Sequence, residues 1–334
     1  MARRSSLRMV ALIAFAMCAL AVGSITTNAQ QSDDLESLTQ QVDKLYRAGK
    51  YAEATEIAER ALAAAERQFS ASDIEVGAAL NNLAELHRAQ GRYAEAEPLY
   101  KRAIAIAENS LGPDHPTLGA ALNNLAGLYR ARARYTEAEP LYRRALAIAD
   151  KSLGPDHPDV GARLNNLAEL YRVQGRYAEA EPLYKRALAI AEKALGPDHP
   201  TLGAALNNLG LLYHVQGRYA EAEPLYERAL AIDEKALGSD HPDIGKDLNN
   251  LAELYQDQGR YGEAELLMKR AVAIAEKALG PHHPDVGTRL NNLAEFYRAQ
   301  GRYAESEPLH KRAIAIAEKA RHAGPRSPDR NEKK

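Results

Sequence analysis

The sequence contains almost no cysteine, since Cys18 is the single one among 334 residues. One cysteine cannot close an internal disulfide, and it leaves little scope for thiol chemistry. Cys18 also lies in an N-terminal segment that we expect to be removed, so the mature chain should contain no cysteine. The folded protein must therefore be held together by packing alone.

Tryptophan is absent and phenylalanine occurs three times. Ala, Leu, Glu, Arg and Tyr dominate instead, a composition typical of helices. There is no excess of positive charge, because the formal net charge is −2, and a nucleic-acid binder would carry a basic face. Phosphate loops, nucleophile elbows and metal-binding motifs are also missing. These absences predict a helical protein that is not an enzyme, needs no cofactor and binds no nucleic acid.

The N-terminus has the pattern of a secretory signal. Three arginines precede an apolar run, Met9–Gly23, and small or polar residues follow up to Ala29. We expect residues 1–29 to be a signal peptide cleaved after Ala29. Met17 stands before Cys18, where a lipoprotein signal has a small residue. The protein is thus expected to be exported, in the periplasm or secreted, without a stable membrane anchor. The alternative is an uncleaved N-terminal anchor, although the run falls short of the ~20 residues that a spanning helix needs.

A fixed repeat dominates the remainder of the chain. The string Leu-Asn-Asn-Leu recurs six times with a step of 42 residues and no insertion. Such a period is typical of a stacked-repeat protein, which grows by contacts between neighbouring copies.

One copy, from Pro158 to Pro200, indicates how the unit folds. Pro158 suits the first turn of a helix, and Gly175 ends that helix in the left-handed conformation. A second helix is predicted from Tyr177 to Leu195, where Gly-Pro stops it. One helix pair cannot bury both of its faces, so the copies must stack. The apolar stripe of the first helix is Leu164, Leu167, Ala168 and Tyr171, and that of the second includes Ala180, Leu183, Tyr184, Ala187 and Leu188.

Proline recurs about five residues into the second helix. At this depth it should remove one backbone hydrogen bond and bend the helix locally. We expect these residues to shape curvature and not to form a site. They are Pro98, Pro140, Pro182, Pro224 and Pro308, and Leu266 replaces the proline in one copy.

These anchor residues, read as Leu-x-x-Leu-Ala-x-x-Tyr, Gly-x-Tyr-x-x-Ala and Tyr-x-x-Ala, resemble the tetratricopeptide repeat. The 42-residue form is similar to the kinesin light chain type. The resemblance implies an all-α, right-handed superhelical solenoid of seven stacked antiparallel helix pairs over residues 33–320, the first pair degenerate. A role with a motor protein does not carry over, because the chain has a signal sequence and lacks a heptad coiled coil. The expected copies are 33–73, 74–115, 116–157, 158–199, 200–241, 242–283 and 284–320, followed by a disordered tail, 321–334.

Two adjacent asparagines recur in every first helix, and we call them the first and the second Asn. The resemblance implies that first helices line a concave groove and that the second Asn clamps a bound peptide. An Asn amide both donates and accepts hydrogen bonds, so a column of Asn can hold an extended backbone. The candidate groove residues are Asn81, Asn82, Asn123, Asn124, Asn165, Asn166, Asn207, Asn208, Asn249, Asn250, Asn291, Asn292, Arg88, Arg130, Arg172 and Arg298.

The four arginines lie seven positions after the first Asn, on the same helix face. Their guanidinium groups suit the selection of carboxylates, although neighbouring acids would temper this by i,i+3 pairing. Those acids are Glu85, Glu169, Glu253 and Glu295. Two alternatives stay open: an Asn column can instead link neighbouring copies, and the Glu and Arg columns can be a solvated face.

One histidine per copy precedes the proline of the first helix. Stacked copies lie roughly a helix diameter, ~10 Å, apart, whereas metal ligands lie near ~2 Å from a shared ion. We therefore expect structural turn residues and no metal site, and His282 beside His283 is a weak signal. The recurring residues are His115, His157, His199, His241 and His283.

The sequence therefore predicts an exported, non-catalytic scaffold that binds an extended peptide or protein segment in its groove. A second hypothesis is a structural or assembly module acting through its convex face or its C-terminal edge. The last helix carries Ile314 and Ile316 and no solvating helix follows, so another copy or a partner is expected there. A third is the regulatory subunit of an envelope enzyme. The partner's identity is beyond the sequence.

Overall fold

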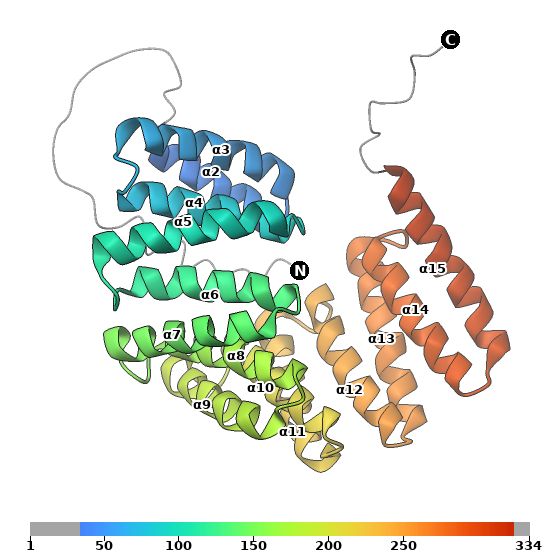
Figure 1. The fold of residues 1–334 in the computed structure, drawn as a ribbon. Helices are drawn as coiled ribbons and strands as arrows, with labels where there is room; N and C mark the ends of the chain where they lie inside the picture. The colour runs from blue at the N-terminus through green and yellow to red at the C-terminus, as the bar shows by residue number, and fades with distance from the viewer. Residues whose placement is uncertain (1–33, 324–334) are drawn as a thin grey trace, which may run out of the picture. The chain divides into compact units, whose positions relative to one another are not determined.

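The computed structural model describes residues 34–323, so the predicted signal peptide and most of the predicted tail lie outside the described residues. Fourteen α-helices follow one another in this range, and no strand occurs in it (Figure 1). The chain divides into two compact units, residues 1–194 and 195–334. We call them the N-terminal and the C-terminal unit.

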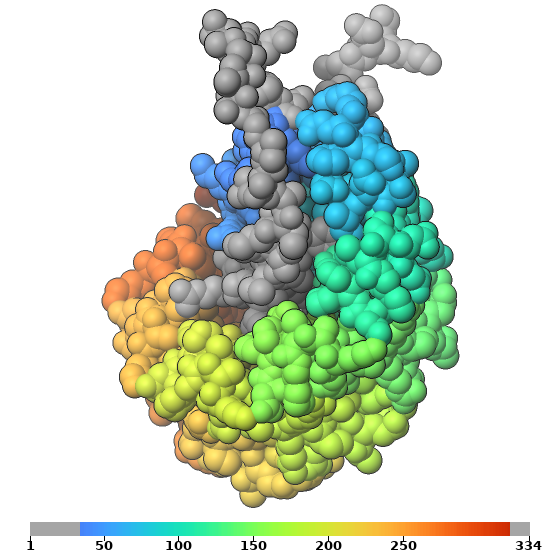
Figure 2. Space-filling view, turned by 90° about the vertical axis from the view of Figure 1, so that its left-hand side faces the viewer, coloured from blue at the N-terminus to red at the C-terminus, as the bar shows by residue number. Residues whose placement is uncertain are grey.

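The helices of the N-terminal unit form four antiparallel pairs. In the space-filling view the copies of this unit follow in sequence order, from blue to green (Figure 2). Each first helix packs against the second helix of its own copy, as α4 does on α5 and α6 on α7. The pairs are α2 (Leu35–Arg47) with α3 (Tyr51–Gln68), α4 (Ile74–Ala89) with α5 (Tyr93–Leu111), α6 (Pro116–Ala131) with α7 (Tyr135–Leu153), and α8 (Pro158–Val173) with α9 (Tyr177–Leu195).

The C-terminal unit continues the same pattern with three pairs. They are α10 (Pro200–Val215) with α11 (Tyr219–Leu237), η1 (Pro242–Ile244) and α12 (Gly245–Asp257) with α13 (Tyr261–Leu279), and α14 (Pro284–Ala299) with α15 (Tyr303–Ala323). The predicted fold class, stacked antiparallel helix pairs, is confirmed. The last helix runs to Ala323, three residues into the predicted tail, 321–334, because the chain meets no helix-stopping residue before Gly324-Pro325.

The turn residues behave as the sequence predicts. Gly175 adopts a φ of +72°, and the N–H of Arg176 donates to the carbonyl of Tyr171 at 2.9 Å, closing the end of α8. Ala133 holds the same turn position in another copy and also takes a positive φ, +56°. Glycine reaches this region without steric cost, so Ala133 carries strain there.

The core is a series of small clusters between copies. Ala168, Ala180 and Ala187, three alanines of the predicted apolar stripes, are all buried. In one cluster, Val160 and Leu164 of α8 pack on Ala149 of α7 and on α9. The helices continue through their internal prolines, as α5 does through Pro98.

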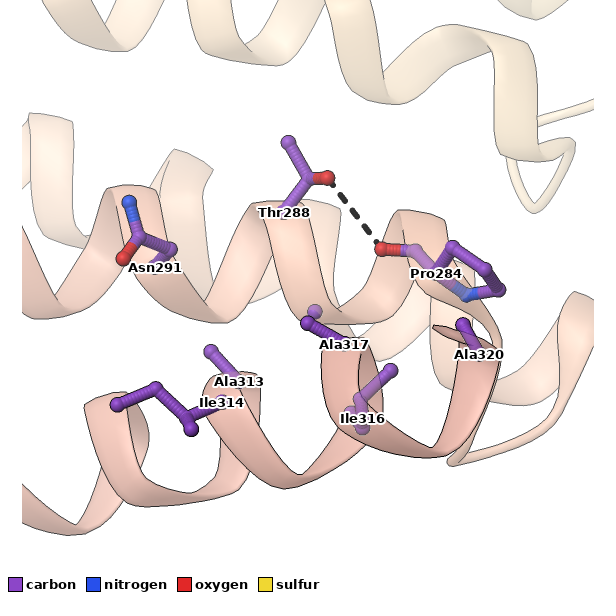
Figure 3. Close-up of a pocket in the computed structure, with 9 residues that line it drawn as sticks. Pro284, Thr288, Asn291, Ala313, Ile314, Ile316, Ala317 and Ala320 are labelled. Carbon is purple, nitrogen blue, oxygen red and sulfur yellow. Dashed lines mark hydrogen bonds between the residues drawn. The ribbon is translucent and has the colours of Figure 1, made fainter. Parts of the chain in front are cut away.

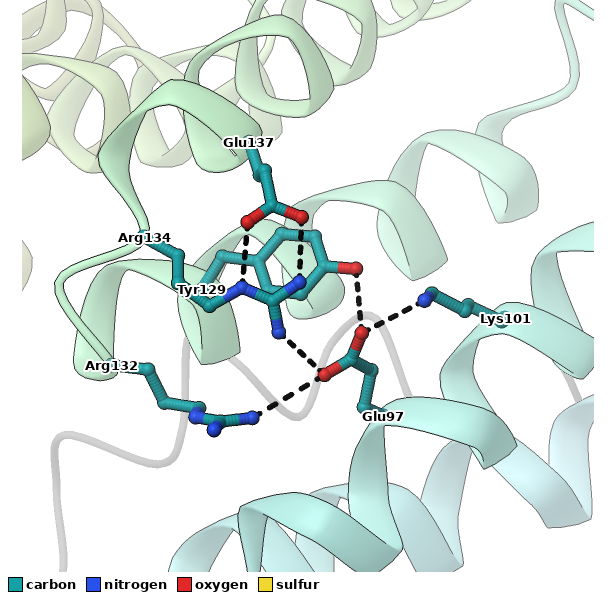
Figure 4. A network of polar contacts seen from close by, with 6 residues as sticks. All are labelled: Glu97, Lys101, Tyr129, Arg132, Arg134 and Glu137. Carbon is teal, nitrogen blue, oxygen red and sulfur yellow. Dashed lines mark hydrogen bonds and ion pairs between the residues drawn. The ribbon is translucent and has the colours of Figure 1, made fainter.

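Polar side chains join the copies as well, most clearly around Glu97 of α5 (Figure 4). Its carboxylate accepts hydrogen bonds from the Tyr129 hydroxyl at 3.0 Å and from Arg134 at 2.6 Å, both in the next copy. Burial raises the pKa of Glu97, but the hydrogen bonds from Lys101, Arg134 and Tyr129 outweigh it and lower the pKa to about 2. The same link recurs between Arg176 and Glu139, between Arg260 and Glu223, and between Arg302 and Glu265.

Candidate functional site

The two Asn columns are joined to each other between copies. In four copies the Nδ2 group of the second Asn donates to Oδ1 of the first Asn in the preceding copy, and we call these bonds the Asn ladder. It contains the pairs Asn124–Asn81 at 3.1 Å, Asn166–Asn123 at 2.9 Å, Asn250–Asn207 at 3.0 Å and Asn292–Asn249 at 3.0 Å. The expected alternative of a structural link between copies is therefore observed at these four bonds.

The ladder makes the two columns unequal. In each ladder pair the first Asn commits its side-chain oxygen to the ladder. Asn81 and Asn207 are also buried, at 8% and 4% exposed, whereas Asn123, Asn165 and Asn249 are half-buried. The second Asn is half-buried in all six copies. It spends one of its two N–H donors on the ladder, so its chemistry leaves Oδ1 and one N–H for a ligand. The second column is thus the better suited to hold a peptide backbone.

The arginine column does not form one shared surface. Arg88 is bound by Glu85 of its own helix, with Nε donating to Oε2 at 2.8 Å, and its side chain is 16% exposed. Glu85 is buried and also accepts hydrogen bonds from the hydroxyls of Tyr46 and Tyr100, at 3.0 and 2.8 Å. A carboxylate ligand would have to compete with this buried acid for Arg88.

Arg130 and Arg172 meet at one carboxylate. Arg172 donates through Nε to Glu169 at 2.8 Å, and Arg130 of the preceding copy lies 3.4 Å from the same carboxylate. Tyr184 donates to it as well, at 3.0 Å. Burial raises the pKa of Glu169, but Arg172 and Tyr184 outweigh burial and lower it. The predicted i,i+3 pairing is confirmed at Arg88 and at Arg172.

Arg298, the fourth arginine, is the most open. Its side chain is 62% exposed, and Nε lies 3.5 Å from Glu295. The Nε2 atom of His310 lies 3.1 Å from the same glutamate. Among the four predicted arginines, this one is the most accessible to a ligand.

A hollow of about 390 Å³ lies along the first helices of the C-terminal unit. Four of its lining residues hold groove positions of the predicted face, and the remainder form an apolar floor. The groove positions are Glu253, Gln256, Asn292 and Glu295, and the floor is Met268, Phe296 and Ala299. This hollow is where the structure brings predicted groove positions of two copies together.

Met268 gives a physical reason for the hollow. The corresponding residue two copies earlier is Tyr184, whose hydroxyl reaches Glu169. Methionine has no hydroxyl, and Glu253, which corresponds to Glu169, is exposed and accepts a hydrogen bond from Asn249 at 2.6 Å. The sequence shows this exchange of Met for Tyr, but the missing Tyr–Glu contact requires the structure.

A carboxyl pair formed by buried Asp247 and half-buried Asp233 distinguishes the C-terminal unit. Asp247 of α12 is 2% exposed, and its Oδ1 accepts a hydrogen bond from Asn207 at 2.6 Å. Burial, and then the neighbouring Asp233 of α11, raise the pKa of Asp247 to about 7. The corresponding positions two copies earlier are Ala149, for Asp233, and Arg163, for Asp247.

The recurring histidines cap the first helices. The Nδ1 atom of each accepts a hydrogen bond from the backbone N–H two residues later, at 3.1–3.3 Å. The predicted structural role is confirmed, and the capping bond is its cause. Within residues 34–323, no group of three or more His, Cys, Asp or Glu is placed to hold a metal ion. Among the helices of the same range, none has the length and apolar character needed to cross a membrane.

The family model described as tetratricopeptide repeat matches this chain in six overlapping segments. They are residues 35–109, 75–151, 117–193, 159–235, 202–277 and 247–319. No curated protein is found to match the chain.

Three similar solved structures place these matches in context. The crystal structure of nearly identical repeats of a putative kinesin light chain from Podosopora anserina is 29% identical, with a TM-score of 0.53, over 63% of this chain and 99% of that chain. A Rap protein complexed with competence and sporulation factor is 16% identical, with a TM-score of 0.61, over 88% of this chain and 78% of that one. PilW, a type IV pilus biogenesis factor, is 20% identical, with a TM-score of 0.54, over 78% and 100%. The last two show likeness of fold alone.

Proposed function

The chain belongs to the tetratricopeptide repeat family, and we propose that it is an exported, non-catalytic scaffold that holds an extended peptide or protein segment along its first helices. Repeats of this family generally serve as protein–protein interaction scaffolds. The Rap protein with a similar fold is complexed with competence and sporulation factor.

The observation that carries the proposal is the hollow between α12 and α14. Its wall contains Asn292, whose side chain can pair with a ligand's peptide bond while it stays in the Asn ladder. Apolar Met268 and Phe296 lie beside it, so the hollow combines polar and apolar contacts, as binding sites commonly do.

The charge of the hollow favours a cationic ligand group. Two carboxylates, Glu253 and Glu295, line it, and the basic side chains beside it, Arg298 and His310, both lie against Glu295. The arginine column was expected to select carboxylates, but Arg88 and Arg172 are held by acids of their own helices. We therefore assign to the hollow a Lys or Arg side chain of the bound segment.

The replacement Met268→Tyr tests the hollow, because it restores the residue of the other copies and fills the space from its floor. Residues 30–334 are used as bait in envelope extract, and partners are identified by mass spectrometry. His87→Tyr is the control, since it also restores the tyrosine that other copies have, at a residue of the N-terminal unit that does not line the hollow. Loss of the partner with Met268→Tyr alone supports the proposal. A partner retained by both variants contradicts it.

Export is proposed from the N-terminal sequence alone. Fractionation of cells expressing the full chain, with mass spectrometry of the mature N-terminus, tests it. Cleavage after Ala29 and recovery outside the cytoplasm are expected. An intact N-terminus in the cytoplasmic fraction contradicts export, and one in the membrane fraction indicates the uncleaved anchor.

A further inference from the structure

The last copy carries an apolar hollow of about 490 Å³ on the face where a further copy would stack (Figure 3). Ile314 points into this region and is 57% exposed, although it is a large aliphatic residue. The lining residues are Pro284, Gly287, Thr288 and Asn291 of α14 with Ala313, Ile314, Ile316, Ala317 and Ala320 of α15. We call this surface the C-terminal face.

The repeat itself indicates what fits this face. Four steps of 42 residues back, Ile314 and Ala317 correspond to Leu146 and Ala149 of α7. There, Val160 and Leu164 of the next copy are fully buried in the same cluster. A helix with aliphatic side chains at i and i+4 therefore covers this surface inside the array.

The rim of the C-terminal face carries two carboxylates whose counterparts in an internal copy form ion pairs with arginines. Glu307 corresponds to Glu139, which binds Arg176 of the next copy at 2.7 Å. Glu318 corresponds to Asp150, which binds Arg186 at 2.5 Å.

The C-terminal face also carries an amide whose counterpart in an internal copy is hydrogen-bonded to the next copy. Asn291 corresponds to Asn123, which accepts a hydrogen bond from Asn166 at 2.9 Å. The matching surface therefore offers two basic side chains and an amide donor beside its aliphatic stripe.

The chain's own N-terminal copy keeps only half of this stripe. Leu38 stands at the position of Leu164, but polar Asp34 stands at that of Val160, and Gln41 and Lys44 stand at those of Leu83 and Leu86. In the array, Leu83 and Leu86 pack against the preceding copy, so a second copy arriving head to tail would bury polar groups without partners.

Two C-terminal faces docked against each other would also match poorly, and so would residues 324–334 of the same chain. Two C-terminal faces would present the acids Glu307 and Glu318 to each other in place of the arginines found inside the array. Residues 324–334 contain no aliphatic residue apart from proline.

We propose that the C-terminal face docks a helical hairpin of another protein, with aliphatic residues at i and i+4 of one helix and two basic residues placed as Arg176 and Arg186 are. This surface is separate from the hollow proposed to bind an extended segment. The charge match and the continuation of the internal interface both favour this occupant over a second copy.

The experiment uses a variant of the full chain as the probe. Asp34→Val, Gln41→Leu and Lys44→Leu give its N-terminal copy an internal-type face, and Ile314→Glu blocks its own C-terminal face. All four replaced residues are exposed, and three of them are polar. The helices should therefore survive, which circular dichroism will verify. Lys50 and Arg60 of the probe already hold the positions of Arg176 and Arg186.

The labelled probe is mixed with the unaltered chain and followed by sedimentation velocity. A one-to-one complex is expected, weakened about tenfold or more when the unaltered chain is replaced by its Ile314→Glu variant, and weakened also by Glu307→Arg. The Met268→Tyr variant of the hollow should bind the probe normally, so failure here is distinguishable from failure of the proposed function. No complex, or one indifferent to Ile314→Glu, overturns the inference. Dimers of the unaltered chain that Ile314→Glu abolishes also overturn it, in favour of a second copy.

Discussion

The side-chain amide of Asn124 donates to Oδ1 of Asn81 at 3.1 Å, so two residues 43 positions apart link successive first helices. This bond predicts a measurable coupling. Asn124→Ala and Asn81→Ala should each lower the free energy of unfolding by about 1 kcal/mol.

The double variant should cost little more than either single one, because both remove the same bond. Urea unfolding of the four proteins gives the coupling energy. Strictly additive losses would show that the ladder contributes nothing at this pair.

Asp247 predicts an unusual dependence of stability on pH. Its folded-state pKa of about 7 exceeds the ordinary 3.8. The free energy of unfolding therefore falls as pH rises from about 4 to about 7, and above that range the loss stays constant. Asp247→Asn cannot ionise and keeps an acceptor for Asn207.

The Asn variant should therefore match the original protein near pH 4 and exceed its unfolding free energy by about 2–4 kcal/mol near pH 8. Asp233→Asn should act in the same direction, because it removes the neighbouring charge. Parallel stability curves from pH 4 to 8 would refute this account of the pair.

Ala133 occupies a turn position at which the other copies have glycine and holds a φ of +56°. Ala133→Gly should raise the unfolding free energy by about 0.5–1 kcal/mol, because relief of left-handed strain exceeds the added chain entropy. The matched reverse change, Gly175→Ala, should lower it by a similar amount. A lower melting midpoint for Ala133→Gly would contradict this explanation.

Ala180 is fully buried where α9 approaches its neighbours. Ala180→Leu should destabilise the protein by about 1–3 kcal/mol through overpacking. Ala178→Leu, at an exposed position of the same helix, is the control and should have little effect. Equal melting midpoints for both variants would argue against close packing at Ala180.

The sequence predicts the helix pairs well because their signals are local. Pro158, Gly175 and the Gly-Pro after Leu195 mark boundaries that the structure reproduces. The 3₁₀ turn at Pro242–Ile244, where the other copies continue as α-helix from proline, has no such local mark.

The site was less predictable because it depends on lateral contacts between copies. Helical spacing places Asn81 and Arg88 on one face, but it does not show that Asn124 reaches Asn81 or that Glu85 holds Arg88. Met268 is visible as a departure from the repeat, whereas the hollow beside it follows only from the contact that the tyrosine would have made.

The most direct test of the groove compares two double variants that break the same ladder bonds. Asn124→Ala with Asn166→Ala removes the second Asn at two bonds, and Asn81→Ala with Asn123→Ala removes the first. The captured segment is titrated against both by calorimetry, after urea unfolding shows that their stabilities match. The account predicts that the second-Asn variant binds at least about tenfold more weakly and that the first-Asn variant binds almost as the original does. Equal affinities for the two variants would contradict it and would leave both Asn columns with a structural role alone.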